Sequence, residues 1–337
     1  MRYSPLGAAH RVPFLVSLAA GVVLIAACTG EPPTEAEAEL PSFAVAANSW
    51  TTRAPMPLSL REHTATVVPT AAGEQIVYVI GGYNTEKKVV NGVYAYNPNT
   101  NTWTTKRPIQ SRRRQTNGAV TIKGKIYVTG GQWGGGVFRE LVVYNPATNT
   151  WNLESVMPNP VRWGVSANLG NKLYTLYGEC TDCDETTGFV RQLWRYDPVA
   201  FQWTRMSDPP RFHAQGVGGV INGKWYVAGG VADRALDVYD PQTNTWASKA
   251  SMPRGHKFAG GAVLGGKLYV IGGSPNQQDV HAYDPVTNTW TTKAPLPTPR
   301  TQLVAVKAVR NGAAVIYALG GQNSLMSSLS KNEEYDD

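Results

Sequence analysis

The chain is poor in charged residues and has no long basic segment. Charged residues make up 16% of its 337 residues, whereas a coiled coil or a disordered chain carries more charge and fewer aromatic residues. The net charge is +7, but no run of Lys and Arg is longer than Arg112-Arg113-Arg114, which disfavours a nucleic-acid partner. The chain has instead 34 Gly, 23 Pro, 10 Trp and 16 Tyr, a composition typical of a turn-rich β protein.

The longest apolar segment, "VPFLVSLAAGVVLIAA" from Val12 to Ala27, is short for a membrane-spanning helix, which needs about 20 residues. Residues 1–27 are therefore interpreted as an export signal. The segment ends in "LIAAC", and small residues directly before Cys28 resemble the lipobox of bacterial lipoproteins. That resemblance implies lipidation of Cys28 and, in a Gram-negative cell, export to the outer membrane. The alternative is an ordinary signal peptide that is cut near Ala27.

Residues 28–47 contain four Glu and lack helix or strand periodicity for most of their length. We interpret them as a flexible acidic tether between a membrane anchor and a folded domain. A short helix through "TEAEAEL" is the alternative.

A phrase that begins with Tyr and ends with Trp recurs five times. Asp or Asn followed by Pro sets a tight turn, so the phrase predicts two strands joined by a turn, with the Trp packed between neighbouring sheets. The copies are "YNPNTNTW" to Trp103, "YNPATNTW" to Trp151, "YDPVAFQW" to Trp203, "YDPQTNTW" to Trp246 and "YDPVTNTW" to Trp290.

Each phrase follows an apolar strand that ends in two glycines, as in "IVYVIGG" to Gly82 and "KLYVIGG" to Gly273. The third unit departs from this pattern with "KLYTLYGE", and we place Glu179 where the second glycine would stand. Four strands per unit, repeated every 43 to 53 residues from Trp to Trp, predict the blades of a β-propeller. Paired glycines followed by Tyr and then Trp resemble the kelch repeat over residues 48–337, and the resemblance implies an all-β, kelch-type β-propeller.

The last Tyr of the series has no Trp after it. This residue is Tyr335, and "AANSW", which ends at Trp50, matches the end of the phrase but has no Tyr before it. We expect the N-terminal strand around Trp50 to pair with residues 331–336 and to close the last blade. The prediction is a six-bladed propeller with one split blade.

The loops after the second strands and the links between blades vary from unit to unit, so we expect function on the face that they form. The residues predicted to open the inner strands would ring the mouth of the central channel there. Guanidinium and imidazole groups in such a ring would bind a carboxylate, sulfate or phosphate, although arginines at this point could instead bond backbone carbonyls. These candidate ligand-binding residues are Arg61, Arg114, Arg162, His213, His256 and Arg300.

Cys180 and Cys183 lie in the longest variable loop, and in an exported protein they are predicted to form a disulfide. A redox CxxC centre would need a helix N-terminus, and zinc would need two further ligands nearby. No metal and no cofactor are therefore predicted.

The favoured function is a cell-envelope binding module that recognises a glycan or protein partner, with the oligomeric state left open. The kelch resemblance also implies two kinds of enzyme. A copper oxidase needs a Cys–Tyr cross-link, which these cysteines do not favour. A sialic-acid mutarotase needs only an acid–base pair and cations that hold a carboxylate, and Glu62, Glu140 and Glu179 lie near the variable rim. A scaffold subunit of an envelope complex is the third possibility, and no catalytic residue is assigned.

Overall fold

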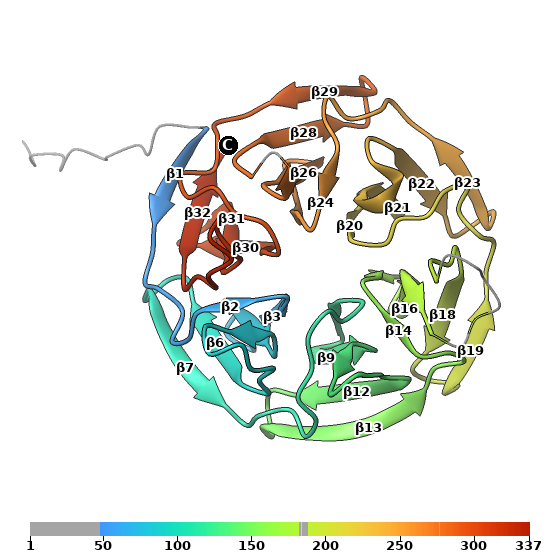
Figure 1. Cartoon of the computed structure of the whole chain (residues 1–337), viewed down its shortest axis with the longest axis horizontal. Coiled ribbons are helices and arrows are strands. Elements are labelled where there is room, and N and C mark those ends of the chain that lie inside the picture. The colour runs from blue at the N-terminus through green and yellow to red at the C-terminus, as the bar shows by residue number, and fades with distance from the viewer. Residues whose placement is uncertain (1–47, 182, 184–187, 276) are drawn as a thin grey trace, which may run out of the picture. The chain divides into compact units, whose positions relative to one another are not determined.

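The computed structural model describes residues 48–181, 183, 188–275 and 277–337. The predicted signal peptide, the tether and Cys28 lie outside the described residues. The described part forms six four-stranded antiparallel sheets arranged in a ring (Figure 1). One 3-10 turn, η1 (Gly230–Ala232), is the only helical element among these residues, and none of their helices is long and apolar enough to cross a membrane.

Each sheet is a blade that runs from an inner strand beside the central channel to an outer strand at the rim. Blades 1 to 3, from the inside outward, are β3 (Thr64–Pro69), β4 (Gln75–Ile80), β6 (Val93–Asn97) and β7 (Thr102–Lys106); β8 (Ala119–Ile122), β9 (Lys125–Thr129), β12 (Glu140–Asn145) and β13 (Thr150–Val156); and β15 (Val165–Leu169), β16 (Lys172–Leu176), β18 (Leu193–Asp197) and β19 (Gln202–Arg205). Blades 4 to 6 are β20 (Gly216–Ile221), β21 (Lys224–Gly229), β22 (Leu236–Asp240) and β23 (Thr245–Ser248); β25 (Gly260–Leu264), β26 (Lys267–Ile271), β28 (Val280–Asp284) and β29 (Thr289–Thr292); and β30 (Val304–Arg310), β31 (Ala313–Leu319), β32 (Asn332–Asp336) and β1 (Ser49–Thr52).

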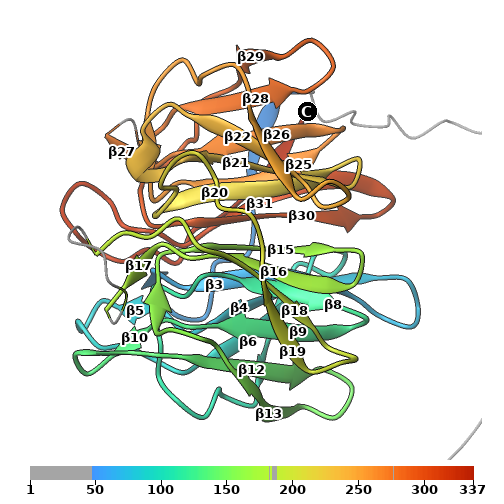
Figure 2. The same ribbon diagram turned by 90° about the vertical axis from the view of Figure 1, so that its right-hand side faces the viewer.

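Short two-residue strands extend several blades on one face. In three blades, the segment that enters the blade pairs with the segment that leaves its second strand, and in blade 2 a small hairpin follows the second strand. Figure 2 shows β5, β10, β17 and β27 together on this face. The pairs are β2 (Leu60–Arg61) with β5 (Tyr83–Asn84), β14 (Val161–Arg162) with β17 (Glu179–Cys180), β24 (His256–Lys257) with β27 (Ser274–Pro275), and β10 (Gln132–Trp133) with β11 (Gly136–Val137).

The recurring phrase builds the outer hairpin of a blade and fastens it to the neighbouring linker. In blade 5, the rings of Tyr283 and Trp290 pack with their centroids 5.2 Å apart. The Tyr283 hydroxyl donates to Oδ1 of Asn288 at 2.8 Å, and Nε1 of Trp290 donates to the Ala250 carbonyl at 2.8 Å. Blades 1, 2 and 4 repeat these contacts. The Trp of the phrase therefore joins adjacent blades, as predicted.

The N-terminal strand closes the last blade with the same contacts. Strand β1 pairs antiparallel with β32, which places Trp50 opposite Tyr335, and the two rings lie 5.0 Å apart. The Tyr335 hydroxyl donates to Oδ1 of Asn48 at 2.8 Å, and Nε1 of Trp50 donates to the Ala294 carbonyl at 3.0 Å. In Figure 1 the blue strand β1 lies beside the red strand β32. The six-bladed propeller with a split blade is confirmed.

The hydrophobic core is divided among the interfaces between blades. Tyr78 of blade 1 and Tyr144 of blade 2 share one cluster of buried side chains, and Tyr96 and Tyr317 share the cluster between blades 1 and 6. Equivalent clusters join the remaining neighbours, so the apolar packing continues around the whole ring.

The paired glycines lie where the next blade approaches closely. Gly81 has a left-handed φ of 65°, and a Cβ on it would lie 2.4 Å from the Arg113 carbonyl oxygen of the following blade. No side chain fits there, which explains the recurring glycine.

Blade 3 departs from the glycine pair in a different way from the one predicted. Tyr177 N donates to the Gln192 carbonyl at 2.9 Å, as the first glycine of the pair does in other blades. Tyr177 therefore takes the place of the first glycine and Gly178 that of the second. The placement of Glu179 at a glycine position was wrong, because Tyr177 and Gly178 occupy both positions and Glu179 follows them.

Candidate functional site

On the variable face, the channel opens through six residues, one from each blade, that we call the mouth ring. Each has a left-handed φ between 54° and 65° and lies just before an inner strand. Its N–H donates to the carbonyl of the preceding member at 2.8–3.2 Å, and the first member donates to the last, so the hydrogen bonds form a closed circle. The mouth ring consists of Glu62, Gln115, Trp163, Gln215, Phe258 and Gln302.

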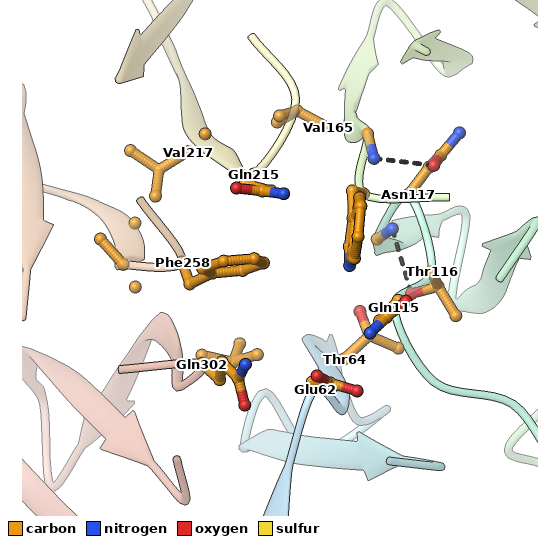
Figure 3. A pocket seen from close by; sticks show the side chains of 18 of the residues that line it. Glu62, Thr64, Gln115, Thr116, Asn117, Val165, Gln215, Val217, Phe258 and Gln302 are labelled. Carbon is orange, nitrogen blue, oxygen red and sulfur yellow. Dashed lines mark hydrogen bonds between the residues drawn. The ribbon is translucent and has the colours of Figure 1, made fainter. Parts of the chain in front are cut away.

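The mouth ring surrounds a cavity of about 290 Å³. Below the ring, the walls come from the first residues of the inner strands and include small residues such as Gly218, Gly261 and Ala305. Figure 3 shows the side chains of Glu62 and Gln115 among those that border the opening. The cavity therefore combines amide, carboxylate and aromatic groups at its entrance with an interior lined by small and aliphatic residues.

Several polar atoms of the mouth ring are buried and lack a hydrogen-bond partner among the described residues. They are Oε1 of Gln115, Oε1 of Gln302 and Nε1 of Trp163. The rings of Trp163 and Phe258 meet edge to face with centroids 6.0 Å apart. The mouth thus contains two acceptors and one donor without protein partners beside aromatic surface, although buried polar groups of this kind are normally hydrogen-bonded.

The predicted arginines of blades 1 and 2 lie on the rim, directly before the mouth ring. The guanidiniums of Arg61 and Arg114 each contact the ring of Tyr83, at 4.7 and 4.8 Å from its centroid. Arg114 Nη1 donates to Glu62 Oε2 at 2.8 Å, whereas Arg61 donates to Gln322. Among the described residues, Arg61 forms no ion pair, so its charge is the less compensated of the two.

The predicted arginine of blade 3 lies at the equivalent position. The Arg162 guanidinium stacks 4.3 Å from the Trp163 ring centroid, and its Nε donates to Glu179 Oε1 at 3.1 Å. Its side chain is 20% exposed. Arg61, Arg114 and Arg162 therefore lie around one half of the mouth, and ligand binding by them stays a prediction.

The remaining three predicted positions are not equivalent to these arginines. His213, His256 and Arg300 lie one residue earlier in their blades, and each is at most 1% exposed. Single-residue differences in the length of the chain between the mouth and the second strand shifted the alignment of the repeats. The positions that directly precede the mouth ring in blades 4 to 6 are Ala214, Lys257 and Thr301.

The three buried side chains stabilise their own blades. Arg300 pairs with Glu333 and donates from Nη2 to the Ala318 carbonyl at 3.0 Å. His213 Nε2 lies 2.9 Å from Asp237 Oδ2, and its Nδ1 bonds the Gly229 carbonyl. Contacts to backbone carbonyls were the alternative that the sequence left open, and they are what these side chains make. The prediction of a six-membered cationic ring was wrong, because half of its members cannot reach the channel.

The sequence did not predict five members of the mouth ring, and of the six only Glu62 had been noted near the rim. A left-handed φ in a residue other than Gly leaves little trace in a single sequence. In blades 1 to 3, the usable signal is that each mouth residue directly follows a predicted arginine.

Cys180 and Cys183 form a disulfide, as predicted, with their Cα atoms 5.5 Å apart. Cys180 follows Glu179 in β17, so the disulfide lies next to the carboxylate that pairs with Arg162.

Comparison with known proteins agrees with this architecture. The family model described as the KLHDC2/KLHL20/DRC7 Kelch-repeats domain matches residues 22–230, and the Kelch motif matches residues 256–297. The chain belongs to the kelch-repeat family.

Individual relatives are more distant. Kelch-like protein 40 from Xenopus tropicalis and that from Xenopus laevis are each 27% identical over 167 residues, which is 48% of this chain and 25% of the relative. The matched part of this chain thus spans about a quarter of the length of these relatives. A solved structure titled "Structure of YjhT" superposes with a TM-score of 0.69 at 18% identity and covers 84% of this chain and 96% of the other. That likeness shows the fold alone.

Proposed function

We propose that this kelch propeller is a cell-envelope binding module that recognises an anionic glycan through the mouth ring and the arginines beside it. The observation that carries the proposal is the set of buried, unpaired polar atoms on Gln115, Trp163 and Gln302 around a cavity of about 290 Å³. Ligand sites typically combine aromatic surface with a few convergent polar groups, and a sugar offers hydroxyl groups to such atoms and C–H faces to aromatic rings.

The charges around the mouth favour an acidic ligand. Glu62 is paired with Arg114, and Arg162 with Glu179. Arg61 has no carboxylate partner in the described part of the chain, and its Nε is buried without a hydrogen bond. A guanidinium in this state would bind a carboxylate or sulfate on a sugar.

The envelope location is a further part of the proposal. It depends on the apolar segment up to Ala27 and on Cys28, which together fit export and lipidation. A lipid on Cys28 and the acidic residues that follow it would tether the propeller to a membrane, the outer membrane in a Gram-negative cell.

A mutarotase of the sialic-acid type is the second candidate. It is favoured by Glu62, whose carboxylate lines the cavity and is held by Arg114 at 2.8 Å. In such an enzyme, Glu62 would exchange a proton with the sugar while an arginine held the sugar's carboxylate.

The test is a panel of sialic acids, uronic acids and sulfated glycans, with both affinity and turnover measured. Gln302→Ala and Trp163→Ala should each weaken binding about tenfold, because each loses a hydrogen bond to the ligand. The matched control is Gln242→Ala, since Gln242 lies in an exposed outer turn of blade 4 and its side chain is not part of the mouth. Unchanged affinity in both mouth variants, or no binding across the panel, would refute the proposed site. Turnover that disappears in Glu62→Gln would establish the enzyme instead.

A further inference from the structure

Blade 5 contains two histidines and an aspartate that the mouth ring does not use. His256 lies in β24, His281 lies in β28, and Asp279 directly precedes β28. One nitrogen of each imidazole and one carboxylate oxygen all lie within 4.8 Å of one another. The two histidines are 1% and 3% exposed, and their ring centroids are 5.2 Å apart.

The second nitrogen of each imidazole is held by the surrounding blade. His256 Nδ1 bonds the Gly272 carbonyl at 2.7 Å, and His281 Nδ1 lies 3.4 Å from the Thr292 hydroxyl. Because a carbonyl can only accept, His256 donates through Nδ1, and the neutral ring carries its lone pair on Nε2.

Both Nε2 atoms are buried without a hydrogen-bond partner in the described structure. His281 Nε2 lies 4.0 Å from Asp279 Oδ2, which is beyond hydrogen-bonding distance. Two imidazole nitrogens without a hydrogen-bond partner therefore lie close to each other and to a carboxylate.

The two neighbouring blades, 4 and 6, hold a base and an acid at the positions of His256 and His281. In blade 4 the same two positions carry His213 and Asp237, and in blade 6 they carry Arg300 and Glu333. Each is a cationic or donor group paired with an acid. Blade 5 carries a second imidazole, that of His281, in place of the acid, so its buried pair contains no carboxylate. A bound cation would give the unpaired Nε2 atoms of blade 5 a partner.

We propose that His256, Asp279 and His281 bind a divalent transition-metal ion. Imidazole nitrogens select Zn²⁺ and related first-row ions, whereas Ca²⁺ and Mg²⁺ prefer sites made of oxygen ligands alone. The Gly272 carbonyl and the Thr292 hydroxyl orient the rings, a role that outer hydrogen bonds commonly have around metal ligands.

The site has to contract slightly when it is loaded. Zn–N distances of about 2.0–2.1 Å place two ligand atoms at most about 4.2 Å apart. Asp279 is the ligand that can move, because its side chain is 22% exposed and its bond to Arg254 is long, at 3.4 Å.

The test is titration of the protein, purified without a polyhistidine tag, with Co²⁺ and then Zn²⁺. We expect one Co²⁺ per chain, with visible absorption bands that Zn²⁺ displaces. His256→Gln and His281→Gln should each weaken binding more than about 100-fold, because the loss of an outer hydrogen bond alone costs 10–100-fold. Arg254→Ala should bind at least as tightly as the parent protein, because it releases Asp279 from its ion pair. His213→Gln removes the equivalent histidine of blade 4 and should leave the Co²⁺ spectrum unchanged.

Thermal unfolding of each metal-free variant shows whether it is folded, and Arg254→Ala, at an exposed residue, provides a variant that is expected to fold. Zn²⁺ should raise the melting temperature of the parent protein and of Arg254→Ala, but not that of folded His281→Gln. The proposal is overturned if the parent protein binds no Co²⁺, or if binding persists in a folded variant that lacks either histidine. Glycan is absent from this experiment, so the result is independent of the function proposed for the mouth ring.

Discussion

Removal of the closing strand should destabilise the propeller strongly. Deleting residues 46–53 removes β1 and leaves β32 as an unpaired edge. The deletion also removes three contacts of this blade. They are the packing of Trp50 on the Tyr335 ring, the hydrogen bond from Trp50 to the Ala294 carbonyl, and the hydrogen bond from the Tyr335 hydroxyl to Asn48.

The cost can be estimated from these contacts. A fully buried Trp→Ala change costs about 3–5 kcal/mol, and the half-buried Trp50 about half of that. The two hydrogen bonds that the deletion removes, one made by Trp50 and one by Tyr335, add roughly 1 kcal/mol each. The loss of about 4 kcal/mol, before any backbone bonds are counted, is a large part of a typical stability of about 5–15 kcal/mol.

Urea denaturation followed by far-ultraviolet circular dichroism measures this loss. A synthetic peptide of residues 46–55, added in trans, should restore stability, whereas the same peptide with Trp50→Ala should not. In the full chain, Trp50→Ala and Trp290→Ala should cost similar amounts, because the two residues make the same contacts in their blades. A deletion that unfolds at the same urea concentration as the intact chain would refute the role of β1 in closing the ring.

Two further predictions concern acid and the membrane. Burial, helped by the charge of Arg300, lowers the pKa of His63 from its ordinary 6.5 to about 4, so the unfolded chain binds a proton that the folded chain does not. Stability should therefore fall by up to about 3 kcal/mol as the pH drops from 6.5 to 4, and His63→Gln should reduce this slope in melting curves taken across that range. Cys28→Ser should abolish the incorporation of a labelled fatty acid into the protein in cells. An unlabelled parent protein would contradict the proposed lipid anchor.

The fold could be predicted from the sequence because the interactions that define it are local and repeated. Within each phrase, the Tyr ring packs on a Trp seven residues later, so the spacing is visible without knowledge of the rest of the chain. The closure could be predicted for the same reason, since Trp50 and Tyr335 are two halves of one phrase. In blade 5 the Tyr–Trp contact lies within one hairpin. In blade 6 the same contact joins two strands from opposite ends of the propeller.

The mouth could not be predicted to the same accuracy because it depends on the register between blades. A one-residue error leaves every strand in place but exchanges an exposed residue for a buried one, as it did for Lys257 and His256. The glycine pair does not reveal such an error, because it lies outside the segment whose length varies. In blade 3, Tyr177 in place of the first glycine led to a second one-residue error, the placement of Glu179.

The circle of backbone hydrogen bonds explains why the side chains of the mouth ring can vary while its backbone geometry is kept. Each member contributes only its N–H and carbonyl to the circle, so Glu62, Trp163 and Phe258 fulfil the same structural role with different side chains. The side chains are then free to serve binding. Two residues before Gln215 and Gln302, the side chains are buried and are paired with an acid, because a cationic group without a compensating partner is costly inside a blade. Side-chain diversity is therefore expected at the mouth, whereas the two histidines of blade 5, whose Nε2 atoms lack hydrogen-bond partners, differ from the base–acid pairs of blades 4 and 6. Within a repeat protein, such a departure points more strongly to a ligand than variation at the mouth does.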